Sequence, residues 1–210
     1  MLPGPVIIHE CPVCSNLIEQ NTLASGNTFG ARFWTDGKMD APMLPDQAWL
    51  VKCEHCSALV WLDEKTEERI IPQPSEEFAK DWYKAVRTAL TPTQEDYKTF
   101  LAGGMRGKKK QRYVRICAWW VGNDSRRESD QEKPLDSFEI ENLRALVTLL
   151  KEKTGNDRIM KAEALRELGE FADAEKLLAT KFNNDLKEAV AIIRNLNQKK
   201  ITTVAEMKSR

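Results

Sequence analysis

The stretches CPVC at residues 11–14 and CEHC at residues 53–56 decide how the N-terminal part of this chain folds. Each stretch places two cysteines two residues apart, so both thiolates of one turn can face a single ion. Two such turns supply four sulfur ligands, which is the ligand set of a closed, tetrahedral zinc site. We therefore predict one structural Zn²⁺ per chain. The predicted ligands are Cys11, Cys14, Cys53 and Cys56.

Other uses of these cysteines fit the pattern less well. Reduced pairs can serve as small core hydrophobes. A redox C-x-x-C motif is typical of one βα turn, and here two pairs stand in a proline-rich segment. The N-terminus has no basic, apolar leader, so we expect cytoplasmic residence and no disulfides. His9 and His55 lie beside the cysteines, but with four thiolates available we expect neither to be a ligand.

Short β-type runs flank both cysteine pairs. Val6–Ile8 leads into the first pair, and Trp49–Val51 and Leu59–Trp61 bracket the second, which is the strand–turn–strand order of a zinc ribbon. The 38 residues between the pairs exceed the roughly 15–20 of a compact ribbon. We assign the excess to an insert at residues 25–45. This insert is either an ordered loop that packs over the ribbon or a surface for a partner.

The candidate surface residues of the insert share aromatic or charged side chains. They are Phe33, Trp34, Asp36 and Lys38. Trp119 and Trp120 are neighbours on a predicted helix, so about 100° separates their side chains. We expect Trp120 to anchor the core and Trp119 to reach an interface.

The pattern of hydrophobic residues changes from short β-type runs to helical spacing after Pro74, and we place the domain boundary there. We predict a zinc ribbon with its insert over residues 1–74 and an α-helical domain over residues 75–210, an α+β protein. Helices are expected over residues 75–90, 93–101, 108–121, 137–152, 159–168, 171–178 and 185–197, with a short tail helix near Val204. Gly122 and Asn123 are expected to stop the third of these, and Gly155 the fourth.

The segment from Ala162 to Leu178 resembles the centre of a tetratricopeptide repeat. Small Ala162 and large Leu165 match its first helix, Gly169 matches the turn, and Ala174 matches the close helix crossing. One repeat cannot bury its own face, so neighbouring helices would have to stack on it. A plain helical bundle explains the same spacing.

Four features of the chain together resemble one group of proteins. They are the two cysteine pairs, the W-T-D-G-K insert at 34–38, the A-W-W-x-x-N-D-x-x-R stretch at 118–127 and the repeat-like end. That group is a set of uncharacterised bacterial proteins with an N-terminal zinc ribbon and tetratricopeptide-like helices. The resemblance implies an architecture and no activity.

Charge is balanced overall, with 32 basic and 32 acidic residues, but it is unevenly distributed. Residues 104–127 carry eight basic side chains against Asp124 alone. Such a run can contact the phosphates of nucleic acid, or it can be a solvated helix face. The candidate contacts are Lys108, Lys109, Lys110, Arg112 and Arg115.

The sequence contains no recognisable catalytic or nucleotide-binding motif. A four-thiolate zinc site has no open position for water and is not catalytic by itself. We therefore expect a zinc-stabilised protein-interaction or adaptor module without catalytic activity, with a protein partner and no membrane insertion. Nucleic-acid binding through residues 106–115 is the alternative, and an enzyme with its site between the two domains is a third.

Overall fold

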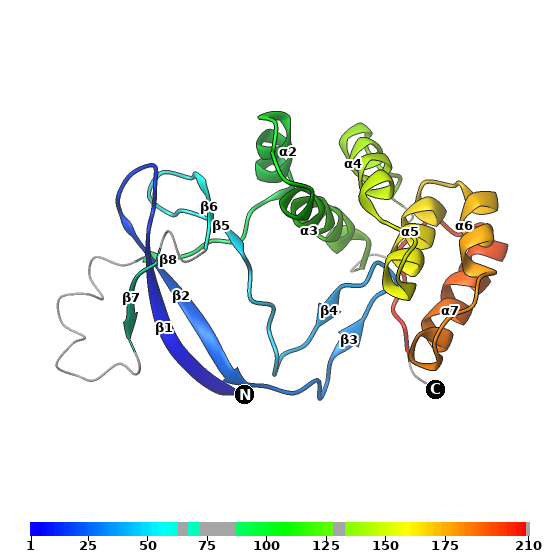
Figure 1. Ribbon diagram of the computed structural model, residues 1–210, viewed down its shortest axis with the longest axis horizontal. Helices are drawn as coiled ribbons and strands as arrows, with labels where there is room; N and C mark the ends of the chain where they lie inside the picture. Colours follow the sequence, from blue (N-terminus) through cyan, green and yellow to red (C-terminus); the bar gives the residue numbers. More distant parts are fainter. Residues whose placement is uncertain (63–66, 72–86, 128–132, 209–210) are drawn as a thin grey trace. The chain divides into compact units, whose positions relative to one another are not determined.

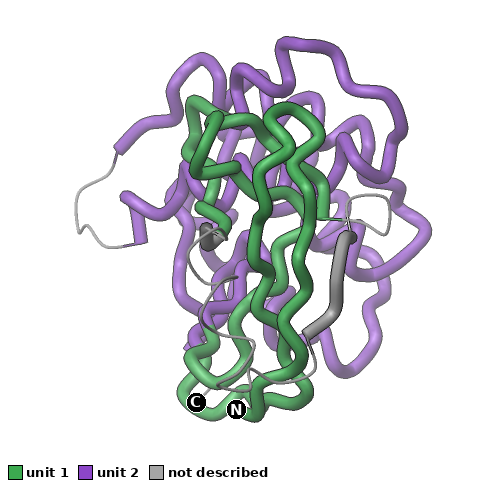
Figure 2. Tube along the Cα trace, turned by 90° about the vertical axis from the view of Figure 1, so that its left-hand side faces the viewer, with its two compact units in different colours: residues 1–31, 41–96 green, residues 32–40, 97–210 purple. Residues whose placement is uncertain are grey.

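The computed structural model describes residues 1–62, 67–71, 87–127 and 133–208, which form an α+β protein (Figure 1). The described residues divide into two compact units (Figure 2). Unit 1 comprises residues 1–31 and 41–96, and unit 2 comprises residues 32–40 and 97–210. Residues 32–40, the centre of the expected insert, thus belong to the helical unit. The expected boundary at 74/75 and the helix expected from residue 75 to 86 lie outside the described residues.

A four-stranded sheet forms one part of unit 1, with strand order β7-β1-β2-β8. Strands β1 (Leu2–Glu10) and β2 (Leu17–Ser25) form an antiparallel hairpin whose turn contains the first cysteine pair. β7 (Glu67–Ile71) pairs with β1, and β8 (Arg87–Thr88) runs parallel to β2. The last residues of the helix expected over 75–90 are therefore strand.

A second antiparallel hairpin in unit 1 carries the second cysteine pair at its turn. It consists of β5 (Leu50–Lys52) and β6 (Leu59–Trp61), as the β-type runs predicted. The hairpin is tied to the segment after β8 by reciprocal backbone hydrogen bonds between Lys52 and Leu90. Apolar side chains of the hairpins pack around the two buried cysteines. They are Ile18, Val51 and Val60.

Within the described residues, six α-helices follow the sheet, and consecutive helices from α3 to α7 pack against one another. Their bounds are α2 (Gln94–Ala102), α3 (Lys108–Arg127), α4 (Ser137–Leu149), α5 (Gly155–Glu167), α6 (Phe171–Leu178) and α7 (Lys187–Gln198). A 3₁₀ turn, η1 (Asn184–Leu186), precedes α7. Ala162, Leu165, Ala174, Leu178 and Ile193 form the core shared by α5, α6 and α7.

Local signals set several of the helix ends. Asp136 caps α4 with a full capping box, accepting from the backbone N–H of Glu139, whose carboxylate accepts from the backbone N–H of Asp136. Gly169 adopts φ +76° after α5, a left-handed conformation that glycine tolerates at little cost.

Two expected helix stops were wrong. Helix α3 continues through Gly122 and Asn123 to Arg127, because buried side chains of its last turns are held by tertiary hydrogen bonds. Gly155 does not end α4; it is the first residue of α5, after the N-cap Thr154, whose hydroxyl accepts from the backbone N–H of Asp157.

The insert and the C-terminal tail pair with each other in unit 2. Strands β3 (Arg32–Phe33) and β4 (Met39–Asp40) form a short hairpin. The backbone N–H of Thr35 donates to the carbonyl of Ala205 at 3.0 Å, and that of Met207 donates to the carbonyl of Phe33 at 2.7 Å. The tail helix expected near Val204 was therefore wrong: the segment is extended and satisfies its backbone groups through the insert.

Candidate metal centre

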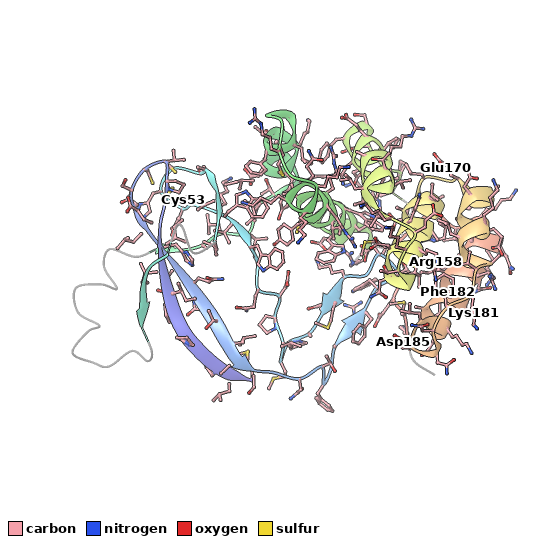
Figure 3. All side chains as sticks on the ribbon, in the orientation of Figure 1. Cys53, Arg158, Glu170, Lys181, Phe182 and Asp185 are labelled. Carbon is pink, nitrogen blue, oxygen red and sulfur yellow. The ribbon has the colours of Figure 1, made fainter. Side chains whose placement is uncertain are left out.

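The four cysteine sulfurs meet at the ends of the two hairpins of unit 1, where Figure 3 labels Cys53. The Sγ atoms of Cys11, Cys14, Cys53 and Cys56 all lie within 4.8 Å of one another. Across the two turns, the Sγ atoms of Cys11 and Cys56 are 3.7 Å apart, and those of Cys14 and Cys53 are 3.8 Å apart. A tetrahedron with metal–sulfur bonds of about 2.3 Å has sulfur–sulfur edges of about 3.8 Å. The cluster therefore has the size and the donor chemistry to hold one metal ion.

The two cysteine turns repeat the same backbone geometry. The N–H of Ser15 donates to the carbonyl of Cys11 at 2.9 Å, and the N–H of Ser57 donates to that of Cys53 at 2.9 Å. The cysteine N–H groups in turn donate to residues five positions on, at 2.9 Å in both turns. Ser15 and Ser57 have φ values of 57° and 61°, in the left-handed region. Each turn thus curls its two thiols toward the same point.

The surroundings shift the pKa values of three of the thiols, those of Cys14, Cys53 and Cys56. The side-chain and backbone hydrogen bonds of Asn16 lower the pKa of Cys14 to about 6. Burial raises the pKa of the Cys53 thiol. The N–H of Ala58 lowers the pKa of Cys56, but burial and the three neighbouring thiols outweigh it and raise that pKa to about 12. Four thiolates at this spacing would repel one another, and a bound cation would neutralise that repulsion.

Neither histidine belongs to the cluster. The imidazole of His9 is buried, and its Nε2 is 2.8 Å from Oε1 of Gln20 on the paired strand. His55 is exposed at the tip of the second turn. In the described part of the chain, the four cysteines are the one group of His, Cys, Asp or Glu side chains arranged to hold a metal.

Two of the four candidate surface residues of the insert, Trp34 and Asp36, are interior residues of unit 2. Trp34 is 5% exposed and lies between the guanidinium groups of Arg32 and Arg127, at 4.7 and 5.3 Å from its ring centroid. Asp36 is fully buried. Phe33 remains 40% exposed, and Lys38 forms a 2.5 Å ion pair with Asp124. The expectation that these residues form one free surface is corrected for Trp34 and Asp36, which the tail and α3 cover.

The expected roles of the two tryptophans also change. Trp119 is 3% exposed, and its Nε1 donates to Glu167 at 2.8 Å, so this side chain belongs to the core and reaches no surface. Trp120 is half-buried, and its Nε1 donates to the carbonyl of Asp36 at 3.1 Å. The buried Nε1–H of Trp119 needs a hydrogen-bond partner, and the carboxylate of Glu167 on α5 supplies it.

Asp36 joins a buried polar network that sequence reasoning did not identify. Its carboxylate pairs with Arg127 and accepts from Asn123 Nδ2 at 3.1 Å, and Asn123 Nδ2 also lies 3.2 Å from both carboxylate oxygens of Glu167. Burial, followed by the charges of Glu163 and Asp36, raises the pKa of Glu167 to about 8. Burial raises the pKa of Asp36 as well, against the lowering effect of Arg127.

A second part of this network fixes the tail. Arg166 and Glu163 are both fully buried and form an ion pair at 2.5 Å one turn apart on α5. The guanidinium of Arg166 also donates to the carbonyls of Ile201 and Thr203. The sequence signal for the network existed in part, because the W-T-D-G-K and N-D-x-x-R motifs contribute Asp36, Asn123 and Arg127. Nothing in the sequence indicated that these motifs meet.

The basic segment is split between exposed and engaged side chains. Lys108, Lys109 and Lys110 are exposed at the start of α3. Arg112 forms a 2.7 Å ion pair with Asp157, and Arg115 donates to Asn142 Oδ1 at 3.2 Å. Those last two expected phosphate contacts therefore serve packing between helices of unit 2.

Comparison of the chain with models of known protein families, with curated proteins and with solved structures finds no match. The resemblance to zinc-ribbon proteins with repeat-like helices is thus supported by the cysteine cluster and the helical C-terminal region alone. No helix in the described ranges combines the length and the apolar character needed to span a bilayer.

Proposed function

We propose that this chain is a zinc-dependent protein-interaction module in which the metal serves folding. The observation that carries the metal assignment is the sulfur–sulfur spacing of 3.7 and 3.8 Å, which matches the edges of a zinc–thiolate tetrahedron. Four thiolates fill the coordination shell of Zn²⁺, so no position is left for a water or a substrate. Cytoplasmic residence would keep the thiols reduced and ready for the ion.

The helical unit supports an interaction role. Ala162 and Ala174 are fully buried where α5 and α6 meet, and Gly169 forms the turn between them, as in a tetratricopeptide hairpin. Helix α7 adds a third layer through Val190 and Ile193. Stacked helical hairpins of this kind present extended surfaces to other proteins. The buried carboxylates of the network form internal hydrogen bonds and ion pairs, which fits a structural role.

The metal assignment is tested by elemental analysis of the purified full chain. We expect one zinc per chain, and less than about a tenth of that for Cys53→Ser because three thiolates cannot close the tetrahedron. Cys117→Ala is the matched control, since Cys117 lies on α3 outside the cluster and its loss leaves the zinc content unchanged. A metal-free chain with ordered cysteine turns would overturn the assignment.

The interaction role is tested by affinity capture from the organism that encodes the chain, with and without nuclease. A protein that is retained after nuclease treatment supports an interaction module. A captured protein that is lost after nuclease treatment favours the second candidate function, nucleic-acid binding. That candidate rests on the exposed Arg106, Lys108 and Lys109 at the start of α3. Its affinity would fall steeply between 50 and 200 mM salt, as counterion release requires.

A further inference from the structure

Two adjoining hollows lie along α7, the last helix of unit 2. One, of about 510 Å³, lies over the outer face of α7 between Ile192 and the tail residue Lys208. The other, of about 470 Å³, lies where the end of α6 meets α7, and Phe182 and Val190 line it. Ala191 lines both hollows, so they adjoin across one small side chain.

The rims of both hollows are basic. Lys181 and Lys187 line the second hollow, and Lys199 and Lys208 line the first. All four are exposed, and no acidic side chain of the described residues forms an ion pair with any of them. Figure 3 labels Lys181 and Phe182 beside each other, one cation next to one apolar contact. Basic side chains therefore outnumber acidic ones around the hollows, and the excess positive charge is available to an outside anion.

The floor of the hollows is apolar and small. Leu178, Phe182 and Val190, each at most 9% exposed, supply it in the second hollow, Ile192 supplies it in the first, and Ala191 contributes to both. Of the described residues that line the two hollows, Glu188 is the one acidic side chain. Arg194 is held in place because its guanidinium donates to the carbonyl of Leu178 and lies 3.2 Å from Glu175. A rigid apolar strip edged by unpaired lysines suits side chains that alternate between apolar and acidic.

We propose that α7 docks a short acidic peptide segment of a partner protein, with apolar side chains in the two hollows and carboxylates toward the four lysines. This inference rests on the proposed interaction role and names its surface and partner class. The 12 residues of α7 span about 18 Å, which an extended segment of five or six residues matches. A nucleic-acid strand fits less well, because bases stack on exposed aromatic rings. Phe182, the one aromatic residue that lines the hollows in the described part of the chain, is 9% exposed and lies under Arg158.

The test is selection of binders from a random octapeptide display library on the zinc-loaded full chain. We expect the selected peptides to be enriched in Asp and Glu interspersed with apolar residues. Measured by fluorescence anisotropy, the variant Lys181→Glu/Lys187→Glu should bind the tightest selected peptide at least tenfold more weakly. The matched control Lys151→Glu/Lys153→Glu makes the same charge change on the exposed segment between α4 and α5, and it should change binding less than twofold.

A second variant separates apolar docking from charge alone. Ala191→Trp fills the junction of the hollows at an exposed position, so we expect it to abolish binding without loss of helical signal. Selection of no acidic peptide, equal weakening by both charge variants, or tighter binding of a single-stranded oligonucleotide would each overturn the proposal. The general interaction role would survive such a result if a nuclease-resistant partner were still captured by the Lys181→Glu/Lys187→Glu chain.

Discussion

The buried ion pair between Asp36 and Arg127 gives the sharpest test of how the insert is held in unit 2. Asp36 is fully buried and the Arg127 side chain is 6% exposed. Substituting Asp36→Asn keeps the shape and the hydrogen bond from the Lys38 N–H, now 3.1 Å from Oδ1. It removes the negative charge and turns an N–H₂ group toward Arg127 or Asn123. Breaking one partner of a buried pair costs about 3–5 kcal/mol.

The lower end of that range applies to Asp36→Asn. Arg127 keeps a 2.7 Å hydrogen bond to the carbonyl of Trp120 and a 2.6 Å ion pair with Asp124, whose side chain is 46% exposed. We therefore expect a loss of about 3 kcal/mol in the free energy of unfolding of the helical unit. For a unit of this size the melting temperature should fall by about 10 °C. Circular dichroism at 222 nm measures the free energy in a urea titration and the melting temperature in a thermal scan.

A double-mutant cycle shows whether the cost comes from the charge left behind. Arg127→Met should also lower the free energy of unfolding by about 3–5 kcal/mol, because it leaves the Asp36 carboxylate buried without its cationic partner. The double variant leaves neither member of this pair charged and should cost no more than either single change, a coupling of about 3 kcal/mol. Lys38→Met is the control: it breaks a partly exposed ion pair of the same insert, with 29% and 46% side-chain exposure, and should cost under about 1 kcal/mol. An Asp36→Asn cost below that of the control, or additive singles, would refute the reasoning.

Three further outcomes follow from the structure. The pKa of Glu167 is raised to about 8, so between pH 5 and pH 8 the folded chain holds a proton that the unfolded chain releases near pH 4.5. The free energy of unfolding should therefore fall by up to about 1.4 kcal/mol per pH unit over that range. Glu167→Gln should flatten that slope in urea titrations, and parallel curves for both proteins would contradict it. Ser57→Gly relieves a residue at φ 61° and should raise the zinc-bound chain's stability by about 0.5–1 kcal/mol; a loss would show that the serine side chain is needed. Asp136→Ala removes a capping box and should cost about 1 kcal/mol, measured by thermal melting against the exposed control Ser137→Ala.

The features that sequence predicted are those that local chemistry determines. The spacing of the cysteines identified the cluster because a two-residue interval brings both thiols of a turn to one ion. Short β-type runs located β5 and β6, and the helical spacing of hydrophobic residues located α4. These patterns need no knowledge of what lies far away in the chain.

The features that sequence did not predict depend on distant contacts. Asp36 and Arg127 are 91 positions apart, and Arg32 and Glu206 are 174 apart. Gly122 and Asn123 carry a local signal to end a helix, but the bonds of Asn123 to Asp36 and Glu167 outweigh it. Trp119 was assigned to a surface because its partner on α5 could not be foreseen from the spacing of residues on α3.

The insert links the metal to the helical unit through the chain itself. Residues 32–40 lie between the two cysteine pairs, so a metal ion held by all four cysteines would close the loop whose centre packs in unit 2. The core shared by α5, α6 and α7 contains none of the four cysteines. We therefore expect release of the metal to leave these helices folded. A chain without zinc would keep its helices while its cysteine turns unfold, which is why Cys53→Ser can separate a partner held by unit 1 from one held by α7.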